Sequence, residues 1–214
     1  SRAPEPVLPL RLFRDPVFAV STAASFIVGL SMFGVIIYVP LYLQVVNGAS
    51  PTKSGLLLTP LMLGLIVGTV GSGRIITKWG RYKAFPVAGM AIMALGIWLL
   101  AQFDTNTPRL TQSIYMAVVG LGIGLVMQVL VLAVQNSVPP EDLGTATSAT
   151  SFFRSMGGAF GVAIFGSIFN SRLDTYIAEV VPAGSGIDSS AIQGGAEALD
   201  RLPPPIRTAV IDSF

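Results

Sequence analysis

The stretch TQSIYMAVVGLGIGLVMQVLVLAVQNS (residues 111–137) lies inside a run of 31 residues without a charged side chain, between Arg109 and Glu141. An α-helix rises about 1.5 Å per residue, so about 20 apolar residues cross a hydrocarbon core of about 30 Å. In lipid, only helices and closed barrels satisfy all of their backbone hydrogen-bonding groups. This stretch therefore predicts a helix that spans a membrane.

The same pattern recurs along the chain. Uncharged runs of 37, 20 and 20 residues separate Asp15 from Lys53, Lys53 from Arg74, and Lys83 from Asp104. A further apolar segment, residues 143–171, contains one charged residue, Arg154, in a length of 29 residues. We predict five spans, near residues 17–45, 55–75, 84–103, 111–137 and 143–171. The predicted fold class is an all-α integral membrane protein.

The composition excludes several classes of function. Of the 214 residues, 52% are hydrophobic and 11% are charged, whereas a soluble globular protein has roughly 25% charged residues. The chain has no His and no Cys, which excludes disulfides, thiolate nucleophiles and the common zinc ligands. Nucleotide-binding Gly-Lys-Ser/Thr loops and Gly-x-Ser-x-Gly elbows are also missing from the sequence. We therefore expect no enzyme activity, no cofactor and no metal site.

The basic residues predict the orientation. Short cytoplasmic loops are enriched in Lys and Arg, and seven such residues lie before the first span or between the second and third: Arg2, Arg11, Arg14, Arg74, Lys78, Arg81 and Lys83. Membrane orientation explains this basic cluster, so we expect no nucleic-acid partner. We predict a multi-pass protein of the cell (inner) membrane with a cytoplasmic N-terminus and an extracytoplasmic C-terminal tail.

Three regions follow from this pattern. Residues 1–15 are predicted to be a cytoplasmic linker, residues 16–173 the five-helix transmembrane region, and residues 174–214 an extracytoplasmic loop or helical hairpin. The chain does not begin with Met and starts with a Pro-rich segment, so we interpret it as an internal piece of a longer protein.

Glycines within the spans predict close helix packing. Small residues spaced at helical intervals let helix backbones approach each other in lipid. They occur here at Gly64, Gly68, Gly71, Gly120, Gly124, Gly157 and Gly161. Pro40 and Pro60 each remove a backbone hydrogen bond and favour a bend. The density of such residues favours a packed bundle over separate anchors.

Polar residues inside the spans are candidates for a substrate pathway. They are Tyr38, Gln44, Gln128, Gln135 and Arg154. The uncharged residues among them either line a wet cavity or hydrogen-bond between helices. An arginine in the middle of a membrane costs about 2.5 to 3.5 kcal/mol on insertion scales, so Arg154 either faces a partner or cavity or reaches the lipid headgroups.

The segment Gly73-Arg-Ile-Ile-Thr-Lys-Trp-Gly-Arg-Tyr-Lys83 resembles the cytoplasmic loop signature of the major facilitator superfamily. Gly73, Gly80 and Arg81 match the signature, and Lys78 is in a basic position. Thr77 stands where the stronger copy of the signature has Asp. Residues 10–14, 42–48, 54–60 and 144–161 resemble phrases of the fourteen-helix multidrug:proton antiporter branch, the EmrB/QacA type.

The resemblance implies a fold, a function and missing parts. It identifies the five spans as helices nine to thirteen of a major-facilitator-type bundle, followed by an outer loop. The implied function is proton-coupled export of small lipophilic or cationic compounds by alternating access, which requires the N-terminal half and final helix that this sequence lacks. Two alternatives remain: a transporter of this fold for a lipid, peptide or siderophore, and a non-transporting membrane scaffold or assembly protein.

Overall fold

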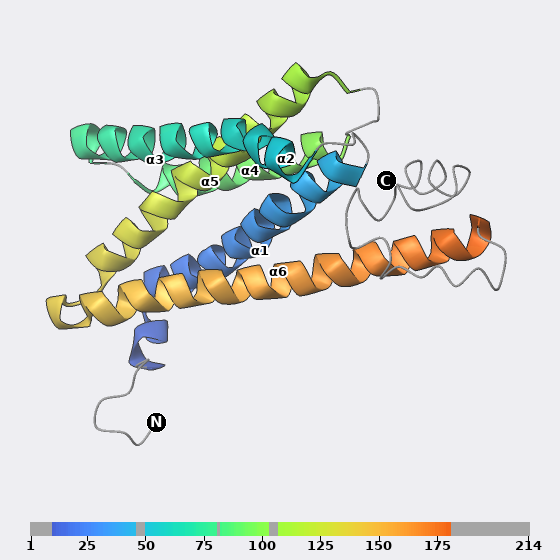
Figure 1. Cartoon of the computed structure of the whole chain (residues 1–214). Coiled ribbons are helices and arrows are strands. Elements are labelled where there is room, and N and C mark those ends of the chain that lie inside the picture. The colour runs from blue at the N-terminus through green and yellow to red at the C-terminus, as the bar shows by residue number, and fades with distance from the viewer. Residues whose placement is uncertain (1–9, 46–49, 81, 103–106, 181–214) are drawn as a thin grey trace. The chain divides into compact units, whose positions relative to one another are not determined.

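The computed structural model describes residues 10–45, 50–80, 82–102 and 107–180, and the regular elements in these ranges are all helical (Figure 1). In chain order they are η1 (Leu10–Arg14), α1 (Pro16–Val45), α2 (Pro51–Leu57), α3 (Thr59–Trp79), α4 (Ala84–Leu100), α5 (Arg109–Ser137), η2 (Pro140–Asp142) and α6 (Leu143–Val180). The predicted all-α fold class is confirmed.

The helix lengths agree with membrane spans. Four segments of the described chain are long and apolar enough to cross a membrane: Pro16–Gln44, Pro51–Trp79, Arg109–Ser137 and Pro140–Arg172. The predicted span near residues 84–103 corresponds to α4, which is apolar and has 17 residues. Helix α4 is therefore at the short end of the range of about 17 to 25 residues that spans a bilayer. The predicted end of that span, Phe103, lies outside the described residues.

The second predicted span, residues 55–75, is divided and longer than expected. Helix α2 ends at Leu57 and α3 begins at Thr59, so Pro60 lies in the first turn of a new helix. A proline in the first turn lacks only an N–H group that would have no partner inside the helix. Pro40, by contrast, lies inside the continuous helix α1. Pro40 therefore removes a hydrogen bond inside a helix, whereas Pro60 removes none.

The last helix also extends beyond its predicted end. Helix α6 has 38 residues and continues to Val180, so the region boundary expected at residue 173 falls inside it. Residues 181–214, with most of the predicted loop or hairpin, lie outside the described residues.

The chain consists of two compact units. The first contains Ser1–Phe33 and Thr59–Gly161, and the second contains Gly34–Leu58 and Val162–Phe214. Helices α1 and α6 each contribute residues to both units.

Within the first unit, α5 packs against α3 and α4 (Figure 1). Glycines make the α3–α5 contact possible, because a Cβ on Gly120 would strike the Leu61 carbonyl oxygen. Reciprocally, a Cβ on Gly64 would strike the Ala117 carbonyl oxygen. Gly68 and Gly124 lie in the same contact, so the predicted packing role of these glycines is confirmed.

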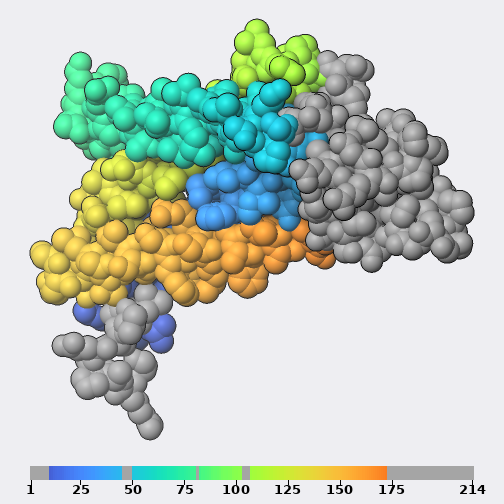
Figure 2. Space-filling view, viewed as in Figure 1, coloured from blue at the N-terminus to red at the C-terminus, as the bar shows by residue number. Residues whose placement is uncertain are grey.

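Gly71 makes no close helix contact among the described residues, so its predicted packing role stays a prediction. A Cβ added at Gly71 would meet no atom within 4 Å. Gly71 therefore lies away from the α3–α5 contact. Helix α3 forms part of the teal region in Figure 2 and carries exposed apolar side chains suited to lipid contact, among them Leu63, Ile66, Val67 and Val70.

Helices α1 and α6 make a second glycine contact in the first unit. A Cβ on Gly157 would strike the Phe26 carbonyl oxygen, and a Cβ on Gly161 would lie 2.5 Å from the Leu30 carbonyl oxygen. The packing role predicted for both residues is confirmed. Gly29, which the sequence reading did not single out, lies directly against the backbone carbonyl of Arg154.

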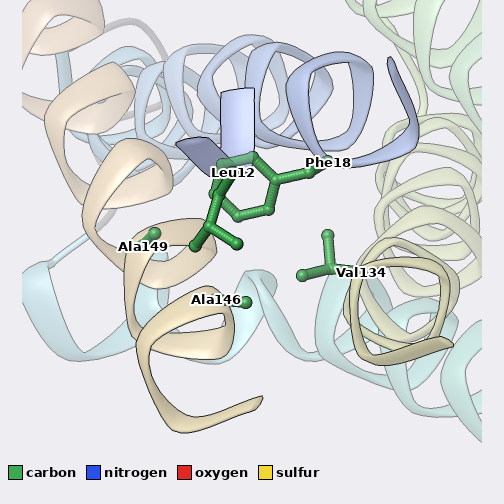
Figure 3. Close-up of a cluster of buried hydrophobic side chains, with 5 residues drawn as sticks. All are labelled: Leu12, Phe18, Val134, Ala146 and Ala149. Atoms are coloured by element: carbon green, nitrogen blue, oxygen red, sulfur yellow. The ribbon is translucent and has the colours of Figure 1, made fainter. Parts of the chain in front are cut away.

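The segment before α1 is folded against the helices. Leu12 of η1 and Phe18 of α1 form a buried cluster with Val134 of α5 and with Ala146 and Ala149 of α6 (Figure 3). Asp15 caps α1 by accepting hydrogen bonds from the Val17 and Phe18 amides at 2.7 and 3.0 Å. Residues 10–15 of the predicted linker thus form a packed start to the helical region.

Candidate functional site

The second unit contains a polar cavity that is wide open to its surroundings and lies between residues of α1 and α6. Its volume is about 840 Å³, and it is lined by Tyr38, Val162, Ala163, Gly166, Ser167, Asn170 and Ser171. Of the five polar pathway candidates from the sequence, Tyr38 is the one that lines this cavity.

Local packing determines the position of Tyr38. Its hydroxyl donates a hydrogen bond of 2.9 Å to the Val162 carbonyl oxygen on α6. A Cβ on Gly166 would lie 2.7 Å from the same hydroxyl, so a glycine is needed there to admit it. The Tyr38 ring lies edge-on to Phe165 at 6.3 Å between centroids, and 6.1 Å from the Phe169 ring. These aromatic contacts hold the hydroxyl at the cavity wall.

The chemistry of the lining is neutral. It combines hydroxyl and amide groups with an aromatic ring, and none of the lining residues carries a charge. Such a surface binds an organic molecule through apolar contact and a few hydrogen bonds. Ser167, Asn170 and Ser171 were missed by the sequence reading, although their spacing of three to four residues places them on one side of α6.

Gln44 belongs to the second unit but does not line the cavity. Its side-chain amide donates a 3.0 Å hydrogen bond to the hydroxyl of Ser54, which is buried. Ser54 in turn donates to the Pro51 carbonyl oxygen at 2.9 Å. Gln44 therefore ties the end of α1 to the first turn of α2.

The two candidates of α5 lie in the first unit. Gln135 is exposed and donates a 3.3 Å hydrogen bond to the Thr147 hydroxyl of α6. Gln128 lies seven residues earlier, on nearly the same face of α5, and is also exposed. Gln135 thus fits the interhelical hydrogen-bonding alternative, and Gln128 is free to meet a molecule outside this unit.

Arg154 is half-buried, and its backbone position is determined by the contact with Gly29. Among the described residues, its guanidinium has no hydrogen-bond or ion-pair partner. The sequences of α1, α3, α4 and α5, and of α6 as far as Arg172, contain no Asp or Glu. An intramembrane acidic partner for Arg154 would therefore have to come from another part of the protein.

The loop motif is partly described. Gly80 follows α3 with a φ of 68°, and its amide donates a 2.8 Å hydrogen bond to the Ile76 carbonyl oxygen. This left-handed conformation ends the helix and favours glycine. Lys78 is exposed in the last turn of α3, and Gly73 lies inside α3 with open space around it. Arg81 lies outside the described residues.

An ion pair that the sequence reading missed joins distant parts of the first unit. Arg11 of η1 contacts Asp142 of η2 at 2.8 Å between Nη2 and Oδ1. These residues are 131 positions apart, so helix periodicity contains no signal for the pairing. The available hint was Asp142 itself, one of two adjacent acidic residues that interrupt a long apolar region.

Comparisons with known proteins extend these observations. A family model described as Major Facilitator Superfamily matches residues 1–162. An uncharacterized MFS-type transporter of Mycobacterium tuberculosis is 46% identical over 213 residues, covering 100% of this chain and 31% of that protein. The multidrug transporter protein MdtP of Bacillus subtilis is 40% identical over 172 residues, covering 80% of this chain and 32% of that protein.

A third relative is named for resistance to an antibiotic. A tetracycline resistance determinant of Streptomyces rimosus is 36% identical over 167 residues, covering 78% of this chain and 48% of that protein. The chain therefore spans about a third to a half of the length of these relatives.

Proposed function

Since the chain belongs to the major facilitator superfamily, we propose that it is part of a proton-coupled multidrug efflux transporter that works by alternating access. The chain is a multi-pass membrane protein by its long apolar helices and by its family. The similar multidrug transporter of Bacillus subtilis and the tetracycline resistance determinant of Streptomyces rimosus support an efflux role.

The cavity beside Tyr38 carries the proposal. A membrane scaffold needs apolar helix faces, whereas this wall combines an aromatic ring with hydroxyl and amide groups. In the transporter, this wall contacts the substrate, and the missing half of the protein supplies the opposite wall. The chain then corresponds to helices nine to thirteen of a fourteen-helix antiporter of the EmrB/QacA type.

The remaining candidates have distinct proposed roles. Gln128 and Arg154 contribute polar contacts along the substrate pathway, and Arg154 pairs with a carboxylate from the missing half or with an anionic group of the substrate. The segment from Gly73 to Lys83 acts as a cytoplasmic hinge, with its sharp turn at Gly80. The N-terminus is cytoplasmic and the tail after α6 is extracytoplasmic, because basic residues flank the other side.

Reconstitution of the full-length protein tests the proposal. Proteoliposomes with an imposed proton gradient should transport ethidium, and collapse of the gradient with a protonophore should stop the transport. Tyr38→Phe removes the cavity hydroxyl and its bond to the Val162 carbonyl while retaining the ring. We expect this variant to raise the KM by about 2- to 13-fold, which corresponds to the loss of one hydrogen bond of about 0.5 to 1.5 kcal/mol.

Tyr115→Phe is the matched control. Tyr115 is a half-buried tyrosine of α5 outside the cavity lining, so the same atom is removed elsewhere. Its KM should stay at the wild-type value. An equal KM for both variants and the wild type would remove the cavity from the substrate pathway. Absence of gradient-driven transport for a panel of lipophilic cations and tetracycline would refute the efflux proposal.

A further inference from the structure

The contact between Arg11 and Asp142 joins two short helical turns at one end of the first unit. Arg11 belongs to η1, which precedes α1, and Asp142 belongs to η2, which connects α5 to α6. The Nη2–Oδ1 distance of 2.8 Å is that of a charge-assisted hydrogen bond. One side-chain contact thus links the start of α1 to the connection between α5 and α6.

The two partners differ strongly in exposure. The side chain of Arg11 is 64% exposed, whereas that of Asp142 is 8% exposed. Asp142 Oδ2 is buried and has no hydrogen-bond partner among the described residues. The carboxylate therefore depends on one bond from a water-accessible arginine, and loss of that bond leaves a buried charge without compensation.

Apolar contacts hold η1 beside this ion pair. Leu12 is 5% exposed in the cluster of Figure 3, and the Phe13 ring lies edge-on to Phe18 at 5.1 Å and to Phe153 at 5.9 Å. Phe153 belongs to α6, so η1 contacts that helix as well as α1. We name η1 together with Asp142 the clasp. It has a dry apolar part and an ion pair that is open to water.

We infer that Asp142 is a positioning residue that, through Arg11, keeps the start of α1 and the α5–α6 connection together as one body during transport. The inference rests on the proposed transport function. Alternating access requires each half to move as a body around the substrate, so the helices within a half must keep their packing. When the ion pair breaks, Asp142 recovers its solvation only if η1 separates from η2, and this separation exposes the cluster beneath.

Cysteine accessibility in the full-length protein measures the state of the clasp. The 214 residues contain no Cys, so Ala146→Cys places a single reporter where the native side chain is fully buried, once any cysteines elsewhere are replaced by serine. A membrane-impermeant maleimide in inside-out vesicles then reports opening of the cluster. Circular dichroism and size-exclusion profiles of each variant confirm that the helices remain folded.

Two substitutions of Arg11 and one control substitution of Arg14 separate the effect of charge from the effect of packing. Arg11→Gln keeps most of the length without the charge, and the rate of maleimide labelling should rise at least about tenfold, because a buried charge is left unpaired. Arg11→Lys should retain the slow wild-type labelling, because the native contact is one bond from one nitrogen. Arg14→Ala, in the same exposed turn, is the matched control and should label at the wild-type rate.

Transport kinetics show whether the ion pair positions the helices for transport or only stabilises the fold. We expect Arg11→Gln to lower kcat for ethidium about tenfold with an unchanged KM, and Arg11→Lys to restore kcat. Equal labelling of Arg11→Gln and Arg14→Ala would overturn the clasp, and so would fast labelling with an unchanged kcat. If the wild-type protein transports none of the tested substrates, the proposed function fails. Fast labelling of Arg11→Gln together with slow labelling of Arg11→Lys would then still support the clasp as a structural contact without a role in transport.

Discussion

Gly120→Ala tests the α3–α5 contact most directly. Besides striking the Leu61 carbonyl oxygen, the new methyl carbon would lie 2.8 Å from the Leu61 carbonyl carbon and 3.0 Å from the Leu65 amide nitrogen. Carbon atoms pack at about 3.5 to 4.0 Å, so α3 and α5 would have to separate by at least about 0.7 Å. These neighbours are all backbone atoms, so a change of side-chain rotamer does not relieve the clash.

The expected loss in the free energy of unfolding follows from this separation of α3 and α5. A radial gap of 0.5 to 1 Å forfeits about a quarter to a half of the attraction between facing atoms, and overpacking of this kind costs about 1 to 3 kcal/mol. For a folding unit of about 150 to 250 residues, 1 kcal/mol corresponds to about 2 to 4 °C. We therefore expect the apparent Tm of the full-length protein in detergent to fall by about 2 to 12 °C, as measured by size-exclusion chromatography after heating.

Gly71→Ala is the matched control on α3. A Cβ at Gly71 meets nothing within 4 Å, and alanine is a better helix former than glycine by about 1 kcal/mol. Its Tm should equal or slightly exceed that of the wild type. A wild-type Tm for Gly120→Ala, or an equal loss for both variants, would refute the assignment of this glycine contact.

Three further predictions concern the orientation and the charged residues. A cysteine at Lys78 should be labelled from the cytoplasm and one at Ser189 from outside, because basic residues flank the cytoplasmic side; labelling of both from one side would contradict the orientation. Arg154→Lys should keep part of the efflux rate and Arg154→Met should lose it, since only the charge can pair with a buried partner; full efflux with an unchanged Tm in the Met variant would show that Arg154 only reaches the headgroups. Arg81→Ala should reduce efflux at a normal expression level, and loss of folded protein instead would indicate a structural role.

The sequence by itself determines the helices and most of their limits. Uncharged runs of sufficient length predict α1, α4 and α5 closely, because lipid offers the backbone no partners and an apolar run must form a helix. Tyr38 is identified as a candidate because it is a polar residue inside a predicted span.

Only the tertiary structure decides which candidates meet. Gly71 lies seven residues after Gly64 and so on nearly the same face of α3, yet a Cβ at Gly71 would meet no atom within 4 Å. Two helices that cross touch over only part of their length, so the place where they cross decides which glycines lie in the contact. The contacts of Tyr38 with Val162 and of Arg11 with Asp142 join residues 124 and 131 positions apart. Each depends on how two helices or turns approach each other in space. Sequence periodicity specifies the face of one helix, whereas the pairing of faces between helices is a property of the packed unit.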